Sequence, residues 1–174
     1  MRRVVVSLVV LAACGTPAPV PDAGPVNPTF IALARDFDGY ESWERFDLGH
    51  QLAGSVHNAG SRSVFMKARP PKGATAWPVG ALFVKVVYAD TGDAGVVDQV
   101  FAMAKRGGAF NPEADGWEWF QLDPAADPRV MIWRGDQPPS KAGYLSGPAG
   151  ACNECHLAAG NDHVLSNELR LSAF

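Results

Sequence analysis

Residues 82–88 read Leu82-Phe83-Val84-Lys85-Val86-Val87-Tyr88, a run of β-branched and aromatic side chains interrupted by one lysine. A run of this length and composition, followed by the turn sequence Asp90-Thr91-Gly92-Asp93, is typical of a β-strand. Further runs rich in Val, Phe, Trp and Ile lie on either side of it and are separated by Pro, Gly and Asp turns. The predicted strands are residues 61–68, 80–89, 98–105, 117–122 and 129–134. Because turns rather than helices connect them, we expect an antiparallel sheet of about five strands.

Two segments before these strands have helical spacing. Phe30-Ile31-Ala32-Leu33-Ala34 and residues 40–46 place apolar side chains three and four positions apart, which predicts one amphipathic helix or two short ones. A closing helix is expected over residues 149–159, ending near Gly160. The predicted fold class is therefore α+β, with N-terminal helix or helices, the sheet and a C-terminal helix.

The C-terminal helix carries the most specific motif of the chain. Cys152-Asn153-Glu154-Cys155-His156 is C-x-x-C-H, the attachment site of a c-type haem. Two thiols three positions apart can each form a thioether with a haem vinyl group, while the adjoining imidazole binds the iron. We therefore expect one covalent haem c, attached through Cys152 and Cys155, with His156 as the proximal iron ligand.

Two other chemistries use similar motifs. A zinc site would need a second pair of cysteines or histidines, and the remaining thiol, Cys14, lies far away in the sequence. A redox-active dithiol would be expected after a strand in a βαβ unit, whereas this motif follows the glycine-containing stretch at residues 144–150. Haem is the favoured interpretation, with zinc and dithiol as the alternatives.

The N-terminus has the features of a bacterial lipoprotein signal. Arg2 and Arg3 form a positive region, residues 4–10 are apolar, and Leu11-Ala12-Ala13-Cys14 resembles a lipobox. The apolar run is too short to span a bilayer, and a plain signal peptide cut near the same place is the alternative. We expect residues 1–14 to be the signal ending in a lipidated Cys14, so that all three cysteines have a use and no disulfide is formed.

Residues 15–28 are rich in proline and have few bulky apolar side chains, which predicts an extended tether. At about 3.1 Å per residue it would reach roughly 40 Å. This arrangement places residues 29–174, long enough for one domain, on the periplasmic side of a membrane. Gly15, rather than Asp, after the lipobox cysteine favours the outer membrane. The net charge of −3 and the lack of a Lys/Arg cluster argue against a nucleic-acid partner.

The order of these pieces resembles the cytochrome P-460 family, which includes the cytochromes called c′-beta. The pieces are Arg62-Ser63-Val64-Phe65-Met66, the segment from Trp77 to Lys85, Gly116-Trp117, and the haem motif followed by Asp162-His163-Val164. The likeness covers nearly all of residues 29–174. It implies a mono-haem cytochrome with a five-coordinate iron that binds or redox-converts a small nitrogenous ligand, nitric oxide or hydroxylamine. Whether the chain is an enzyme, a hydroxylamine or nitric oxide oxidoreductase, stays open.

The resemblance assigns roles to two basic residues. Lys85 matches the lysine that cross-links to the haem edge in P-460 members, although a solvent-facing strand lysine is the ordinary alternative. Desolvating its ammonium would cost several kcal/mol, so Lys85 should face water or a site. Arg62 matches a distal arginine that could hydrogen-bond an iron-bound ligand or a haem propionate, and an ion pair at the rim is its alternative.

At one position the sequence departs from the family. P-460 enzymes place a carboxylate on the following strand to accept protons, and here Phe101 occupies that position. An aromatic side chain above the iron is what c′-beta members use to restrict the distal side to small gases. Oxidation of hydroxylamine is thus in doubt, because proton transfer needs a carboxylate or an imidazole near the bound nitrogen.

The alternative function is simple electron transfer by a six-coordinate iron. Three methionines, Met66, Met103 and Met131, could offer a thioether, and three histidines, His50, His57 and His163, could offer an imidazole. Methionines in strands more often belong to the core, and His57 looks like a loop residue. A redox partner protein is expected in either case, and the resemblance suggests a homodimer.

Overall fold

The structure is a computed structural model that describes residues 28–53, 57–90, 95–135 and 152–174. Six strands form one sheet in the order β1-β2-β3-β4-β5-β6, and every neighbouring pair is antiparallel. The strands are β1 (Glu44–Gln51), β2 (Gly60–Met66), β3 (Leu82–Tyr88), β4 (Val97–Lys105), β5 (Trp117–Leu122) and β6 (Met131–Gly135). The predicted antiparallel sheet is confirmed, with one strand more than expected.

The additional strand replaces part of the predicted N-terminal helix. Only two 3₁₀ turns form, η1 (Ala34–Phe37) and η2 (Tyr40–Ser42), and β1 begins at Glu44. The helical interpretation of residues 40–46 was therefore wrong. Within β1 the partly buried Phe46 and Leu48 alternate with exposed Asp47, which is the period of a strand. Pairing with β2 thus overrides a helical pattern only seven residues long.

The remaining helical elements are short. The helix α1 (Cys152–Leu157) carries the C-x-x-C-H motif, and three more 3₁₀ turns are η3 (Pro112–Ala114), η4 (Asn167–Leu169) and η5 (Leu171–Ala173). The part of the predicted C-terminal helix before Cys152 lies outside the described residues, as do the predicted signal, Cys14 and all but the last residue of the tether. No helix in the described ranges is long and apolar enough to cross a membrane.

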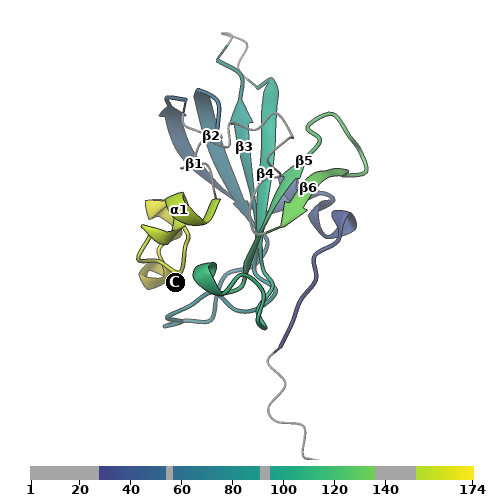
Figure 1. Cartoon of the computed structure of the whole chain (residues 1–174). Helices are drawn as coiled ribbons and strands as arrows, with labels where there is room; N and C mark the ends of the chain where they lie inside the picture. Colours follow the sequence, from purple (N-terminus) through teal and green to yellow (C-terminus); the bar gives the residue numbers. More distant parts are fainter. Residues whose placement is uncertain (1–27, 54–56, 91–94, 136–151) are drawn as a thin grey trace, which may run out of the picture.

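The two faces of the sheet are covered by opposite ends of the chain (Figure 1). On one face Ala32, Phe37 and Tyr40 of the N-terminal segment pack on side chains from β2 to β5. On the other face α1 and the C-terminal segment contribute Cys152, Val164, Leu169 and Leu171 to a second cluster, which includes Phe83, Met103 and Trp119 of the sheet. Alternation along each strand therefore gives the sheet two separate hydrophobic cores.

Candidate functional site

A cavity of about 590 Å³ lies between the sheet and the C-terminal segment. This volume is within the range of about 300–1,000 Å³ found for small-molecule and cofactor sites. Aromatic and aliphatic side chains from the sheet form much of its wall, among them Val64, Phe83, Trp119 and Trp133. The motif residues Cys152, Cys155 and His156 of α1 line the same cavity.

The three site residues predicted on strands also line this cavity, namely Arg62 on β2, Lys85 on β3 and Phe101 on β4. The strand register explains why they meet. Lys85 pairs with Val64 of β2 on one side and with Phe101 of β4 on the other. Arg62 is two residues before Val64 and therefore projects from the same face of the sheet.

The position of His156 is determined by a hydrogen bond on the back of its ring. His156 Nδ1 lies 2.7 Å from the carbonyl oxygen of His163. A carbonyl can only accept, so Nδ1 carries the proton and Nε2 keeps its lone pair. Burial is the main reason that the pKa of His156 is lowered to about 4, and the bond to His163 acts in the opposite direction. The result is a neutral imidazole whose Nε2 can bind a metal, oriented as second-shell contacts orient ligands in metalloproteins.

The turn that supplies this carbonyl is tightly held. Asp162 and His163 both have left-handed backbone conformations, with φ of 48° and 65°, which are unfavourable for residues other than glycine. The Asp162 carboxylate accepts hydrogen bonds from Lys105 Nζ at 2.6 Å and from the Trp77 backbone N–H at 2.6 Å. The Asp162 carbonyl accepts a third from Trp117 Nε1 at 2.9 Å. These contacts offset the strain and hold the His163 carbonyl within hydrogen-bonding distance of His156 Nδ1.

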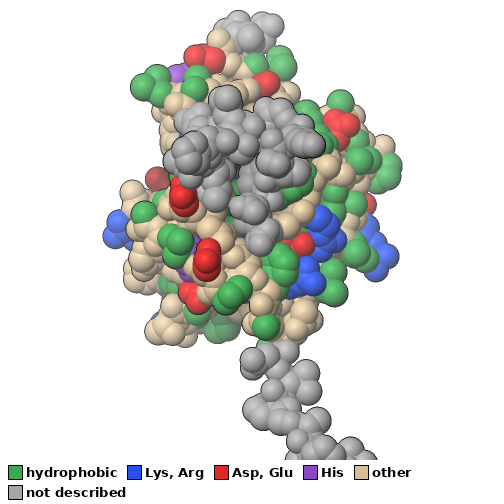
Figure 2. Space-filling model, viewed as in Figure 1, with side chains coloured by type: hydrophobic (Ala, Val, Ile, Leu, Met, Phe, Trp, Pro, Cys, Tyr) green, Lys and Arg blue, Asp and Glu red, His purple; other side chains and the backbone are tan. Residues whose placement is uncertain are grey.

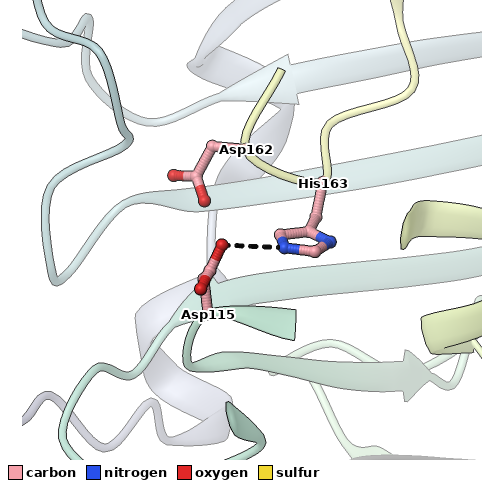
Figure 3. Close-up of side chains that lie close together, drawn as sticks. All are labelled: Asp115, Asp162 and His163. Atoms are coloured by element: carbon pink, nitrogen blue, oxygen red, sulfur yellow. Dashed lines mark hydrogen bonds and ion pairs between the residues drawn. The ribbon is translucent and has the colours of Figure 1, made fainter. Parts of the chain in front are cut away.

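Figure 3 shows Asp115, Asp162 and His163 close together. One candidate ligand atom from each lies within 4.8 Å of the others, and His163 Nε2 is 3.0 Å from Asp115 Oδ2. The Lys105 ammonium already neutralises the buried Asp162 carboxylate. We therefore interpret this group as support for the turn rather than as a metal site.

A buried amide joins α1 to the sheet. Asn153 Oδ1 accepts hydrogen bonds from Trp119 Nε1 at 2.9 Å and from Asn111 Nδ2 at 3.0 Å, and Asn153 Nδ2 donates to Asn111 Oδ1 at 2.7 Å. The Trp119 and His156 rings lie 4.5 Å apart. One of the two variable positions of C-x-x-C-H thus anchors the helix, a role that the sequence motif does not reveal.

Two positive side chains face the cavity without an opposite charge beside them. Arg62 donates to Gln51 Oε1, to the Leu52 carbonyl and to the Asn58 carbonyl, all neutral acceptors. Its pKa is lowered by burial. Among the described residues no carboxylate forms an ion pair with either Arg62 or Lys85. The cavity therefore has a positive wall that suits an anionic group.

Lys85 is the more strongly perturbed of the two. Burial, followed by repulsion from Arg62, lowers the pKa of Lys85 to about 7, and the Cys155 thiol acts in the opposite direction. Its amine is then neutral in a large fraction of molecules at neutral pH. A neutral amine is the nucleophilic form of lysine, as a covalent bond to a cofactor would require.

The cavity also contains a histidine that the sequence offered only as one of three possible sixth ligands. His57, described above as a loop residue, lines the cavity, and its ring lies against Phe101 with the centroids 4.6 Å apart. Of the other histidines, His50 is exposed beside Asp90 and His163 supports the turn. Met103 lines the cavity, whereas Met131 packs on the opposite face of the sheet.

Comparison with protein-family models, with curated proteins and with solved structures gives no match.

Proposed function

We propose that the chain is an exported c-type cytochrome of the P-460 type that carries one covalent haem c. In this proposal Cys152 and Cys155 form the thioethers and His156 is the proximal ligand of a five-coordinate iron. The haem would supply a redox-active iron that binds or redox-converts a small nitrogenous ligand, nitric oxide or hydroxylamine.

The observation that carries the proposal is the convergence of the predicted residues. Cys152, Cys155 and His156 come from the C-terminal helix, and Arg62, Lys85 and Phe101 come from three strands, yet all six line one cavity. The zinc and dithiol alternatives give no reason for a motif helix to adjoin a cavity of about 590 Å³ with apolar walls.

Three further features of the cavity support a haem. The lone pair of His156 Nε2 is available because its Nδ1 donates to the His163 carbonyl. Arg62, which forms no ion pair with a carboxylate among the described residues, offers a positive charge for a haem propionate. The walls formed by Phe83, Met103 and Trp119 give the apolar surroundings that a tetrapyrrole needs.

The residues of the chain have separate tasks in this proposal. Arg62 is the hydrogen-bond donor for a propionate or for an iron-bound ligand, and Lys85 is the amine placed to cross-link to the haem edge. Phe101 limits the size of what reaches the distal side. None of these tasks requires movement of the sheet, because all three side chains project from adjacent paired strands.

The location and partners of the proposal rest on sequence alone. A lipidated Cys14 and the tether at residues 15–28 would hold the domain on the periplasmic side, with the outer membrane favoured. A redox partner protein would exchange electrons with the haem, and a homodimer is proposed from the family resemblance.

The test is the mass of the protein after export in a host that attaches c-type haem. We expect the mass of one haem on the mature chain, in a peptide that contains Cys152 and Cys155. Peptide mapping then shows whether Lys85 is joined to the same haem. Cys152→Ala with Cys155→Ala should abolish the added mass, whereas Glu154→Ala, an exposed neighbour on α1, should retain it. Colourless exported protein without tetrapyrrole mass would overturn the proposal.

The second candidate is a six-coordinate electron carrier. It is favoured by Met103 and His57, which both line the cavity and could supply a sixth ligand. A low-spin ferric spectrum that does not change on addition of nitric oxide or hydroxylamine would select this alternative. A high-spin spectrum that changes on addition would select the ligand-binding function.

A further inference from the structure

We propose that the His57 imidazole forms a hydrogen bond with the ligand bound in the cavity. The site would then bind a ligand bearing N–H or O–H groups more tightly than a variant without this imidazole. This inference rests on the proposed function, because it assigns a residue to the space in which an iron-bound ligand would lie. His57 would then supply a polar group on the side of the cavity where Phe101 stands at the position of the family's carboxylate.

The location of His57 supports this role. It lies three residues before β2 and lines the same cavity as Arg62, Lys85 and His156. Its ring packs edge-on against Phe101, with an interplanar angle of 79°. The imidazole therefore lies beside the side chain that the family resemblance assigns to the distal side of the iron.

The residue after His57, Asn58, is held by hydrogen bonds from two strands. The Asn58 backbone N–H donates to Gln99 Oε1 at 2.8 Å, and Asn58 Nδ2 donates to Asp98 Oδ2 at 2.7 Å. The Asn58 carbonyl accepts from Arg62 Nη2 at 2.9 Å. Side chains of β2 and β4 thus hold the residue after His57 in place, and His57 Nδ1 takes no part in this.

One ring nitrogen of His57 is left for a ligand. His57 Nδ1 is buried and has no hydrogen-bond partner among the described residues. Buried polar groups are nearly always hydrogen-bonded, so an unpaired one at the wall of a cavity needs an explanation. A ligand with an N–H or O–H group would satisfy Nδ1 in either tautomer, because such a group can donate to a bare nitrogen and its lone pair can accept from a protonated one.

The surroundings keep this imidazole neutral. Burial, followed by the charges of Lys85, Arg62 and His156, lowers the pKa of His57 to about 2. Glu168 is an acidic residue that lines the same cavity, and the Asp98 carboxylate accepts a hydrogen bond from Asn58. His57 therefore acts by hydrogen bonding and not as a charged group.

The experiment compares ligands and variants in exported protein whose covalent haem has first been verified by mass. His57→Leu removes both hydrogen-bonding nitrogens, His57→Gln keeps an amide, and His50→Gln changes an exposed histidine outside the cavity. Dissociation constants are measured for hydroxylamine and for nitric oxide on the ferric protein, by rapid mixing before turnover.

We expect His57→Leu to weaken hydroxylamine binding about two- to tenfold, the effect of one hydrogen bond, and to change nitric oxide binding less than twofold. His57→Gln should restore part of the loss, and His50→Gln should match the unmodified protein. Should the leucine variant fail to accumulate, the same comparison between ligands is made with His57→Gln, which should still bind hydroxylamine less tightly.

Three results would overturn the inference. Equal effects on the two ligands, or no effect on either, would show that His57 does not contact the bound ligand. A low-spin ferric protein that becomes high-spin in His57→Leu would make His57 an iron ligand instead. The absence of haem from the unmodified protein is a different result, because it refutes the proposed function itself.

Discussion

Breaking the buried ion pair between Lys105 and Asp162 is expected to destabilise the fold strongly. The two side chains are 8% and 5% exposed, and Lys105 Nζ lies 2.6 Å from Asp162 Oδ1. Removing one partner of such a pair leaves a buried charge and costs about 3–5 kcal/mol. We expect this loss in the free energy of unfolding for Asp162→Asn, which retains one oxygen to accept from the Trp77 N–H.

The Asp162 carboxylate also holds the turn whose carbonyl orients His156. The cost of leaving a charge buried can be separated from the loss of these other contacts by also changing Lys105. The single variant Lys105→Met should also destabilise the protein. The double variant Asp162→Asn with Lys105→Met should lose less free energy of unfolding than the sum of the two single losses, because no charge remains buried. Urea unfolding at pH 7, followed by tryptophan fluorescence and circular dichroism, measures each free energy.

The matched control for Lys105 is Arg69, whose side chain is 64% exposed in its ion pair with Glu44. Arg69→Met should change the free energy of unfolding by no more than about 1 kcal/mol. A loss below about 1 kcal/mol for Asp162→Asn, or strict additivity in the double variant, would refute the reasoning, since either result would mean that the pair is effectively solvated.

Three other predictions concern the cavity and its support. In chain produced without export, so that no haem is attached, the contribution of Lys85 to stability should be flat below pH 7. It should rise by up to about 1.4 kcal/mol per pH unit between pH 7 and pH 10.5, because the unfolded state keeps the Lys85 proton that the folded state has lost. Lys85→Met should remove this rise, and a variant with the same profile above pH 7 as the unmodified chain would contradict the prediction. Asn153→Ala should lower the free energy of unfolding by about 2–4 kcal/mol, because the Trp119 and Asn111 groups bonded to Asn153 stay buried without partners. Glu154→Ala should be near neutral in the same urea assay, and equal effects of the two changes would contradict the anchoring role of Asn153. Gly60→Ala should prevent stable folding, because a Cβ would lie 2.0 Å from the Tyr88 carbonyl oxygen, while Gly49→Ala meets nothing within 4 Å and should cost far less in thermal unfolding.

The sheet could be predicted from the sequence because its strands are strongly patterned. The runs around β3 and β5 are rich in β-branched and aromatic residues, and their predicted positions agree with the structure to within two residues. The strand β1 was missed because its alternation depends on Phe46 and Leu48 only, and its pairing with β2 is a tertiary effect. Short segments with few apolar residues do not distinguish a helix from a strand.

The candidate site shows the same limit. The C-x-x-C-H motif is local, so its residues could be named from the chain, and the family resemblance supplied Arg62, Lys85 and Phe101. His57 was named only as one of three possible histidine ligands, and its place in the cavity could not be predicted, because it depends on side chains of β4 about forty residues away that bind Asn58. The role of Asn153 likewise depends on Asn111, a partner 42 residues earlier. No spacing rule in one sequence reveals such contacts.

The meander order of the strands has a consequence for biosynthesis. Each strand pairs only with its immediate sequence neighbour, so every hairpin can close as soon as its second strand has been synthesised. The sheet residues that line the cavity, including Arg62, Lys85 and Phe101, come from β1 to β6, whereas both motif thiols follow β6 in the sequence. The sheet can therefore form before the motif helix has been synthesised. A truncated chain ending at β6 should still form the sheet, but it would lack the two thiols that bind haem in the proposed function.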